Sequence, residues 1–128
     1  MAQASIPKWQ IVTGWVLSGI LAFLFVPSAF FKIAQPAGFL EAWTKSYPAG
    51  AARPLGVIEL TMFALYLVPK TRYLGGLVML AYLGGAVATH LHAGDGMFFV
   101  PILVGITAWL GLYLRDRKLR ALVPTVYE

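Results

Sequence analysis

Two kinds of side chain that could carry protons or bind a polar ligand stand within apolar sequence. Glu59 interrupts the apolar run 55–60, and His90 and His92 end another apolar run. A carboxylate and an imidazole can each act as a general acid or base. An ionisable side chain deep in a membrane span costs about 3 kcal/mol on insertion scales, so it should face a partner or water. Glu59 and His90 are therefore the candidate catalytic groups.

Two cations that could pair with Glu59 lie at the ends of apolar runs, which we expect to be helices packed in one bundle. Lys32 ends the first apolar run, and Arg53 stands six residues before Glu59. A cation there could stabilise an oxygen that develops negative charge. Because His90 and His92 are two residues apart, they point in different directions on a helix, and the deeper His90 is expected to face inward.

The sequence thus predicts a ligand site in the outer half of a helical bundle. Its predicted ligand-binding residues are Lys32, Arg53, Glu59, His90 and His92. A purely structural interpretation stays open, in which Glu59 pairs with Lys32 or Arg53 to fix helix register, while the cations reach from helix ends toward the headgroups.

Other site chemistries find no pattern in the chain. No HxxxH or ExxH pair places two ligands on one helical face, and there is no cysteine, so no metal site is predicted. The net charge of +5 comes from Lys and Arg at the ends of apolar runs, which indicates membrane topology rather than nucleic-acid binding.

The elements that must position these residues are apolar helices. Hydrophobic residues make up 59% of the 128 residues and charged residues 12%, against about 25% charged in soluble domains. Apolar runs over 11–31, 54–68, 73–90 and 98–114 predict four membrane spans in one transmembrane domain, 1–128. The predicted fold is an all-α integral membrane four-helix bundle.

The orientation follows from the distribution of positive charge. One side of the predicted bundle carries seven of the ten Lys and Arg residues: Lys8, Lys70, Arg72, Arg115, Arg117, Lys118 and Arg120. The positive-inside rule then places both termini in the cytoplasm, which requires an even number of spans and so supports the short second one.

The longest connection, 33–53, lies on the opposite side. Phe39, Trp43 and Tyr47 recur there every four residues, which predicts a short amphipathic interfacial helix between the first two spans, with an ordinary loop as the alternative. Small residues at helical spacing, such as Gly14 and Ser18, favour close helix packing within the monomer or a contact in a homo-oligomer.

Three segments in this order resemble the DoxX-like family of small bacterial membrane proteins. They are Phe30-Phe31-Lys32 followed by Phe39, then Leu55-Gly56-Val57-Ile58-Glu59-Leu60, then Gly84-Gly85-Ala86-Val87-Ala88-Thr89-His90-Leu91, and the resemblance covers about residues 15–117. It implies a multi-pass protein of the bacterial inner membrane, with Lys32, Glu59 and His90 as family-typical polar residues. Relatives are linked to redox stress, thiosulfate oxidation and quinone detoxification.

We therefore expect a protein that binds a lipophilic, quinone-like molecule as an accessory or subunit of a membrane redox system. No haem or flavin pattern is present, so no intrinsic cofactor is expected, and the absence of cysteine argues against a thiol relay. The alternatives are a non-catalytic assembly or stabilising partner of another membrane protein, and an acid–base enzyme of isomerase type with a lipid-soluble substrate.

Overall fold

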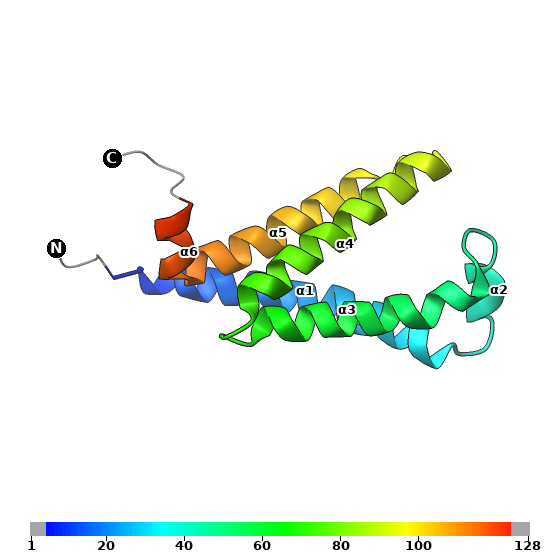
Figure 1. The fold of residues 1–128 in the computed structure, drawn as a ribbon, viewed down its shortest axis with the longest axis horizontal. Coiled ribbons are helices and arrows are strands. Elements are labelled where there is room, and N and C mark those ends of the chain that lie inside the picture. Colours follow the sequence, from blue (N-terminus) through cyan, green and yellow to red (C-terminus); the bar gives the residue numbers. More distant parts are fainter. Residues whose placement is uncertain (1–4, 124–128) are drawn as a thin grey trace.

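Helices account for all the regular secondary structure in the part of the chain that the computed structural model describes, residues 5–123 (Figure 1). The all-α prediction is confirmed. The elements follow in the order α1 (Lys8–Ala34), α2 (Phe39–Trp43), η1 (Ala49–Ala51), α3 (Ala52–Leu67), α4 (Arg72–Ala93), α5 (Phe99–Arg115) and α6 (Arg117–Leu122).

The four long helices have the apolar character of membrane spans. By length and composition, α1, the segment 49–67 and α4 are each able to cross a membrane, and α5 is a shorter apolar helix of 17 residues. At 1.5 Å per residue α5 is about 25 Å long, near the lower end of what a hydrocarbon core requires. Large apolar side chains face outward, with Phe23 80% and Leu77 68% exposed, as lipid contact requires. The chain is a helical membrane bundle, and the limits of the individual spans stay predictions.

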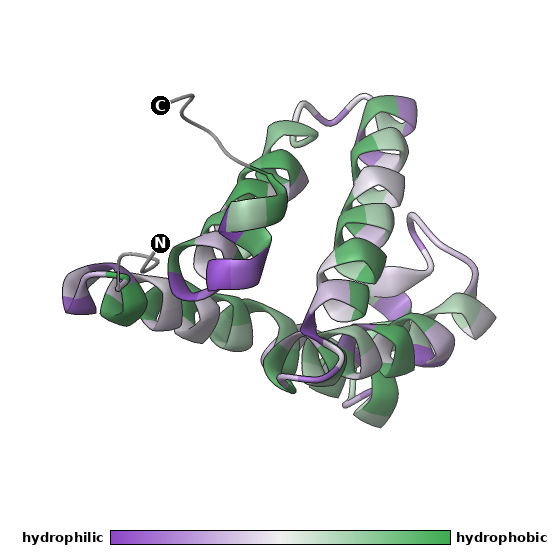
Figure 2. Ribbon diagram, turned by 60° about the vertical axis from the view of Figure 1, so that its left-hand side comes forward, coloured by the Kyte–Doolittle hydropathy of each residue, from purple (hydrophilic) through white to green (hydrophobic). Residues whose placement is uncertain are grey.

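The long helices form a ring of four neighbours in which α1 and α4 each pack against both α3 and α5. Apolar residues dominate these helices, and hydrophilic residues gather near their ends (Figure 2). At one end of the bundle lie α6 and the α3–α4 connection. Toward the other end the α1–α3 pair diverges from the α4–α5 pair (Figure 1).

Close backbone approach explains why the α6 end is closed. A Cβ atom on Gly75 would overlap the backbone of Leu65 and Tyr66, and one on Gly14 would come within 2.8 Å of the carbonyl oxygen of Gly111. Only glycine allows helices to approach so closely. At the opposite end Gly85 has no neighbouring atom within 4 Å of its Cβ position, so α4 is not held there by glycine packing.

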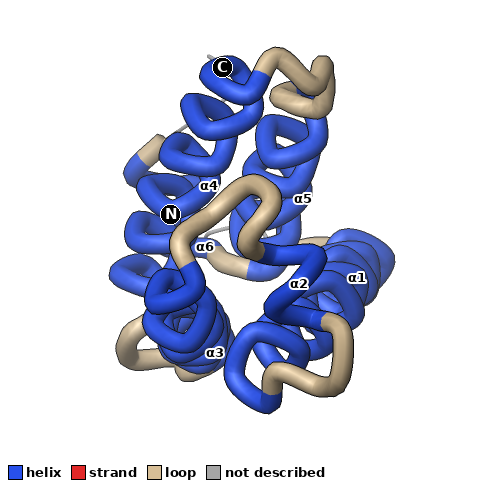
Figure 3. The backbone as a smooth tube through the Cα atoms, turned by 90° about the vertical axis from the view of Figure 1, so that its right-hand side faces the viewer, coloured by secondary structure: helices blue, strands red, loops and turns tan. Residues whose placement is uncertain are grey.

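The predicted connecting helix is present but short. α2 spans five residues, and the aromatic series continues beyond it, with the rings of Phe39 and Trp43 stacked at 5.7 Å and those of Trp43 and Tyr47 at 4.5 Å. The Trp43 indole also donates a hydrogen bond to the carbonyl of Pro48. Seen from the open end, α2 and its flanking loops lie across the ends of α1 and α3 (Figure 3).

Candidate functional site

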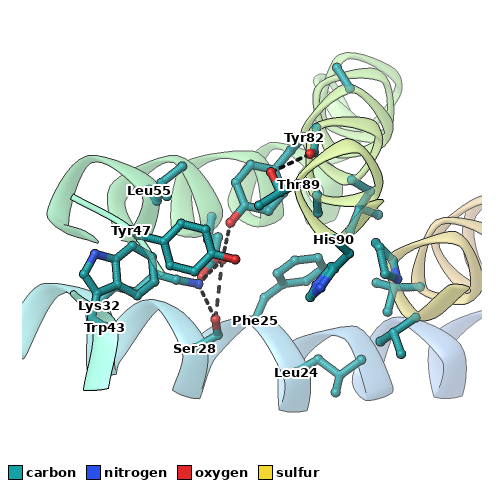
Figure 4. A pocket seen from close by; sticks show the side chains of 18 residues that line it. Leu24, Phe25, Ser28, Lys32, Trp43, Tyr47, Leu55, Tyr82, Thr89 and His90 are labelled. Carbon is teal, nitrogen blue, oxygen red and sulfur yellow. Dashed lines mark hydrogen bonds and ion pairs between the residues drawn. The ribbon is translucent and has the colours of Figure 1, made fainter. Parts of the chain in front are cut away.

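A cavity of about 560 Å³ lies in the open half of the bundle, and all four long helices contribute to its walls (Figure 4). Its volume is within the range of about 300–1,000 Å³ typical of small-molecule sites. The apolar wall includes Leu24, Phe25, Leu55, Leu83, Val100 and Val104. The polar side chains of the wall are Ser28, Lys32, Trp43, Tyr47, Glu59, Tyr82, Thr89 and His90.

An ion pair between α1 and α3 is the charged centre of this cavity. Lys32 Nζ lies 2.5 Å from Glu59 Oε1, and it also donates to Ser28 Oγ at 2.7 Å. Ser28 and Lys32 are four residues apart, so α1 presents both on one face. The side chains of Glu59 and Lys32 are only 3% and 14% exposed, respectively. The pair is therefore removed from the surroundings of the bundle, as the cost of a charge in lipid requires.

Glu59, on α3, is bound by groups from two other helices, but through one oxygen only. Tyr82, on α4, donates its hydroxyl to Oε1 at 2.5 Å, and Ser28 approaches the same oxygen at 3.4 Å. The other oxygen, Oε2, is buried and has no hydrogen-bond partner among the described residues. A buried acceptor without a protein partner is costly, so this oxygen is available to a donor group of a bound molecule.

His90 lines the same cavity, but it is engaged elsewhere. Its Nδ1 lies 2.7 Å from Asp95 Oδ2, in the connection between α4 and α5, and Asp95 Oδ1 accepts the backbone N–H of Met97. The hydrogen bond from His90, together with that from Met97, lowers the pKa of Asp95 below its usual value. No hydrogen bond joins His90 to Glu59 within residues 5–123, so the two candidate acid–base groups line the cavity without contacting each other.

The two remaining predicted ligands, Arg53 and His92, are absent from the cavity wall. Arg53 Nε donates to the carbonyl of Ile33 at 3.3 Å, which ties the start of α3 to the end of α1. His92 is exposed near the end of α4. Of the five residues predicted to bind a ligand, the fold thus brings together Lys32, Glu59 and His90.

Sequence reasoning missed the two hydroxyl groups that contact the ion pair, those of Tyr82 and Ser28. The four-residue spacing between Ser28 and Lys32 was a signal that could have found the serine. Tyr82 stands within the apolar run of α4, seven residues before Thr89, and a tyrosine in such a position needs a partner for its hydroxyl. Among residues 5–123, no group of three His, Asp or Glu residues is placed to hold a metal ion.

These features define a class: a small helical membrane protein with a buried ion pair at the wall of a partly open cavity between its helices. A family model described as the DoxX-like family matches residues 16–111, and the chain belongs to that family. Comparison with curated proteins and with solved structures gave no match.

Proposed function

We propose that the cavity binds a lipophilic small molecule with a flat ring that carries oxygen atoms, such as a quinone. The observation that carries this proposal is the Lys32–Glu59 pair, buried in the wall of a cavity whose other surfaces are mainly apolar. An apolar chamber with a few placed polar groups is the usual form of a small-molecule site. The Lys32 ammonium has three N–H donors, so it can serve a ligand oxygen in addition to Glu59 and Ser28.

Aromatic side chains at the wall support the choice of a ring. Trp43 and Tyr47 both line the cavity and are already stacked on each other at 4.5 Å. A flat conjugated ligand would find apolar contact on such a surface and a cation beside it for its oxygen. Leu24 lines the cavity and is 45% exposed on the outside of the bundle, so a molecule dissolved in the bilayer can reach the cavity from the lipid.

The biological setting of the proposal is a membrane redox system. The chain would act as an accessory or subunit that holds the lipophilic molecule, while the electron-transferring centres belong to a partner protein. We place it as a multi-pass protein of the bacterial inner membrane, with both termini in the cytoplasm and His90 at the outer half.

A stabilising partner for another membrane protein is the second candidate. It requires only a structural role of the ion pair, and the tight α1–α3 contact fits such a role, because a Cβ on Gly56 would lie 3.0 Å from the carbonyl oxygen of Ala29, beside the Lys32–Glu59 pair. The pair would then serve only to pin these two helices. An isomerase that uses Glu59 together with His90 is less well supported, because His90 bonds to Asp95.

Equilibrium binding of decylubiquinone to the purified protein in neutral detergent tests the proposal. We expect saturable binding by the wild type and at least about ten-fold weaker binding by Glu59→Gln, or roughly 1.4 kcal/mol. Glu41→Gln is the matched control, since Glu41 is an exposed carboxylate on α2, and it should bind as the wild type does. A wild type that binds nothing, combined with a Glu59→Gln variant that merely folds in lower yield, would favour the stabilising role instead.

A further inference from the structure

A second cavity lies toward the opposite, closed end of the bundle, and neither Lys32 nor Glu59 lines it. It has a volume of about 340 Å³ and lies between α4, α5 and α6. Leu77 and Leu80 from α4, Leu112 from α5, and Leu119 and Leu122 from α6 contribute to its walls. Leu77 and Leu122 are 68% and 74% exposed, so this groove opens to the outside of the bundle, where acyl chains surround a membrane protein.

The helix that closes one end of the groove is firmly anchored. Asp116 caps α6 by accepting the backbone N–H of Leu119, and it also accepts the hydroxyl of Tyr73 at 2.8 Å. Its second oxygen lies 2.6 Å from Arg72 Nη2, and the Asp116 side chain is fully buried. The groove is therefore preformed rather than dependent on a free C-terminal segment.

The surroundings of the groove are strongly cationic. On a helical wheel Leu119 and Leu122 share one face of α6, Lys118 and Arg120 flank that face, and Arg117 lies on the opposite side. Arg117 and Lys118 are exposed and form no ion pair within residues 5–123. Among the described residues, Asp116 is the one acidic residue at this end of the bundle, and its charge is neutralised by the ion pair with Arg72.

We propose that this groove binds an anionic phospholipid, with an acyl chain between α4 and α5 and the phosphate beside Lys118 and Arg120, the two cations that flank the apolar face of α6. Each part of such a lipid has a complementary feature here. The outward-facing apolar groove suits an acyl chain, and the unpaired positive charge on α6, beside the groove, suits the phosphate. Basic residues at a membrane surface each contribute about five-fold to the binding of anionic lipid, whereas a zwitterionic lipid lacks this gain. The site is separate from the cavity of the proposed function and does not depend on it.

Native mass spectrometry of the purified full chain tests the site, with phosphatidylglycerol and phosphatidylcholine added in equal amounts. We expect the wild type to retain phosphatidylglycerol at least about five-fold better. Lys118→Gln should bring this preference close to one, whereas Arg117→Gln, on the opposite side of α6, should change it little. Lys45→Gln, an exposed lysine at the other end of the bundle, is the matched control and should leave it unchanged.

Two further measurements separate the lipid from other anions and the groove from the charge. Leu77→Trp, which fills the groove, should reduce retention of both lipids, and millimolar inorganic phosphate should not displace phosphatidylglycerol. Equal retention of the two lipids by the wild type, an unchanged preference in Lys118→Gln, or displacement by phosphate alone would each overturn the proposal.

Discussion

The Lys32–Glu59 pair is stable in the bundle only because each charge compensates the other. Removing one partner of a buried pair leaves an uncompensated charge and costs about 3–5 kcal/mol, whereas replacing both by apolar groups is often neutral. We therefore expect Lys32→Met and Glu59→Leu each to lower the free energy of unfolding by about 3 kcal/mol. The double variant should lose clearly less than the sum, as measured by denaturation in mixed micelles. Additive losses would mean that the two charges are not coupled.

The hydroxyl of Tyr82 has a smaller but separable effect. A hydrogen bond to a charged group contributes about 1.5–3 kcal/mol, so Tyr82→Phe should destabilise the protein by about that amount. Tyr47→Phe is the matched control, because Tyr47 also lines the cavity but keeps its ring stacking with Trp43 after the change. The same denaturation measurement should show a loss below about 0.5 kcal/mol for the control. Equal losses in the two variants would contradict the role of the hydroxyl.

At the residue scale the sequence revealed the charged members of the site and not their partners. Lys32, Glu59 and His90 stand out because ionisable groups are expensive in apolar sequence. Arg53 and His92 stood out for the same reason, but cost alone does not tell whether a side chain turns toward the cavity. That outcome depends on helix rotation, which contacts such as Arg53 with the carbonyl of Ile33 determine.

The capping contact of Asp116 holds the short α6 at the end of α5. Burial raises the pKa of this carboxyl, but the N–H of Leu119, the hydroxyl of Tyr73 and the charge of Arg72 together bring it below the usual value. A carboxyl with a lowered pKa contributes stability above its unfolded pKa of about 3.9, and that contribution is lost as the pH falls through its folded pKa. We expect α6 amides to lose hydrogen-exchange protection below about pH 4.

The control for this pH dependence is Asp116→Asn. It should already show weak protection of α6 at pH 7 and little further change on acidification, because the titrating group is gone. Protection of α6 that falls equally in the wild type and in the variant would show that other carboxyls are responsible.

Glycine at position 75 permits the close crossing of α3 and α4. Because a Cβ there would overlap the backbone of Leu65 and Tyr66, Gly75→Ala should lower the free energy of unfolding by about 1–3 kcal/mol. Gly85→Ala is the matched change on the same helix, where no atom lies within 4 Å of the new methyl group. It should be neutral or stabilising by up to about 1 kcal/mol, since glycine weakens a helix interior. Thermal unfolding in detergent distinguishes the two, and an equal response would refute the close contact.

At the element scale the long helices could be predicted because hydropathy and charge mark them directly. Their relative angles could not, since they follow from where backbones touch. Small residues are present at both ends of α4, yet Gly75 is in contact and Gly85 is not. The spacing of small residues shows where close packing is possible, and only the fold shows which of these positions uses it.

The whole molecule combines a closed end, where glycines and Asp116 lock the helices, with an open end that contains the cavity. The distribution of positive charge predicts which end of the bundle faces the cytoplasm. The closed end carries Arg72, Arg115 and Lys118, whereas Lys45 and Arg53 lie at the open end. If positive charge stays in the cytoplasm, the cavity belongs to the outer half of the membrane.

Single cysteines can establish this sidedness, because the natural chain contains none. Lys45 and Lys118 are both exposed lysines, one in the α2 connection and one on α6. In cells whose outer membrane has been permeabilised, a maleimide that cannot cross the inner membrane should label Lys45→Cys at once. It should label Lys118→Cys only after the inner membrane is opened, because an even number of spans keeps the chain termini on the cytoplasmic side.

Two outcomes would contradict this arrangement. Immediate labelling of Lys118→Cys with protection of Lys45→Cys would show that the protein has the opposite orientation, with the cavity in the inner half of the bilayer. Labelling of both at once would mean that an even number of helices crosses the membrane between them, and not the three that the fold places there.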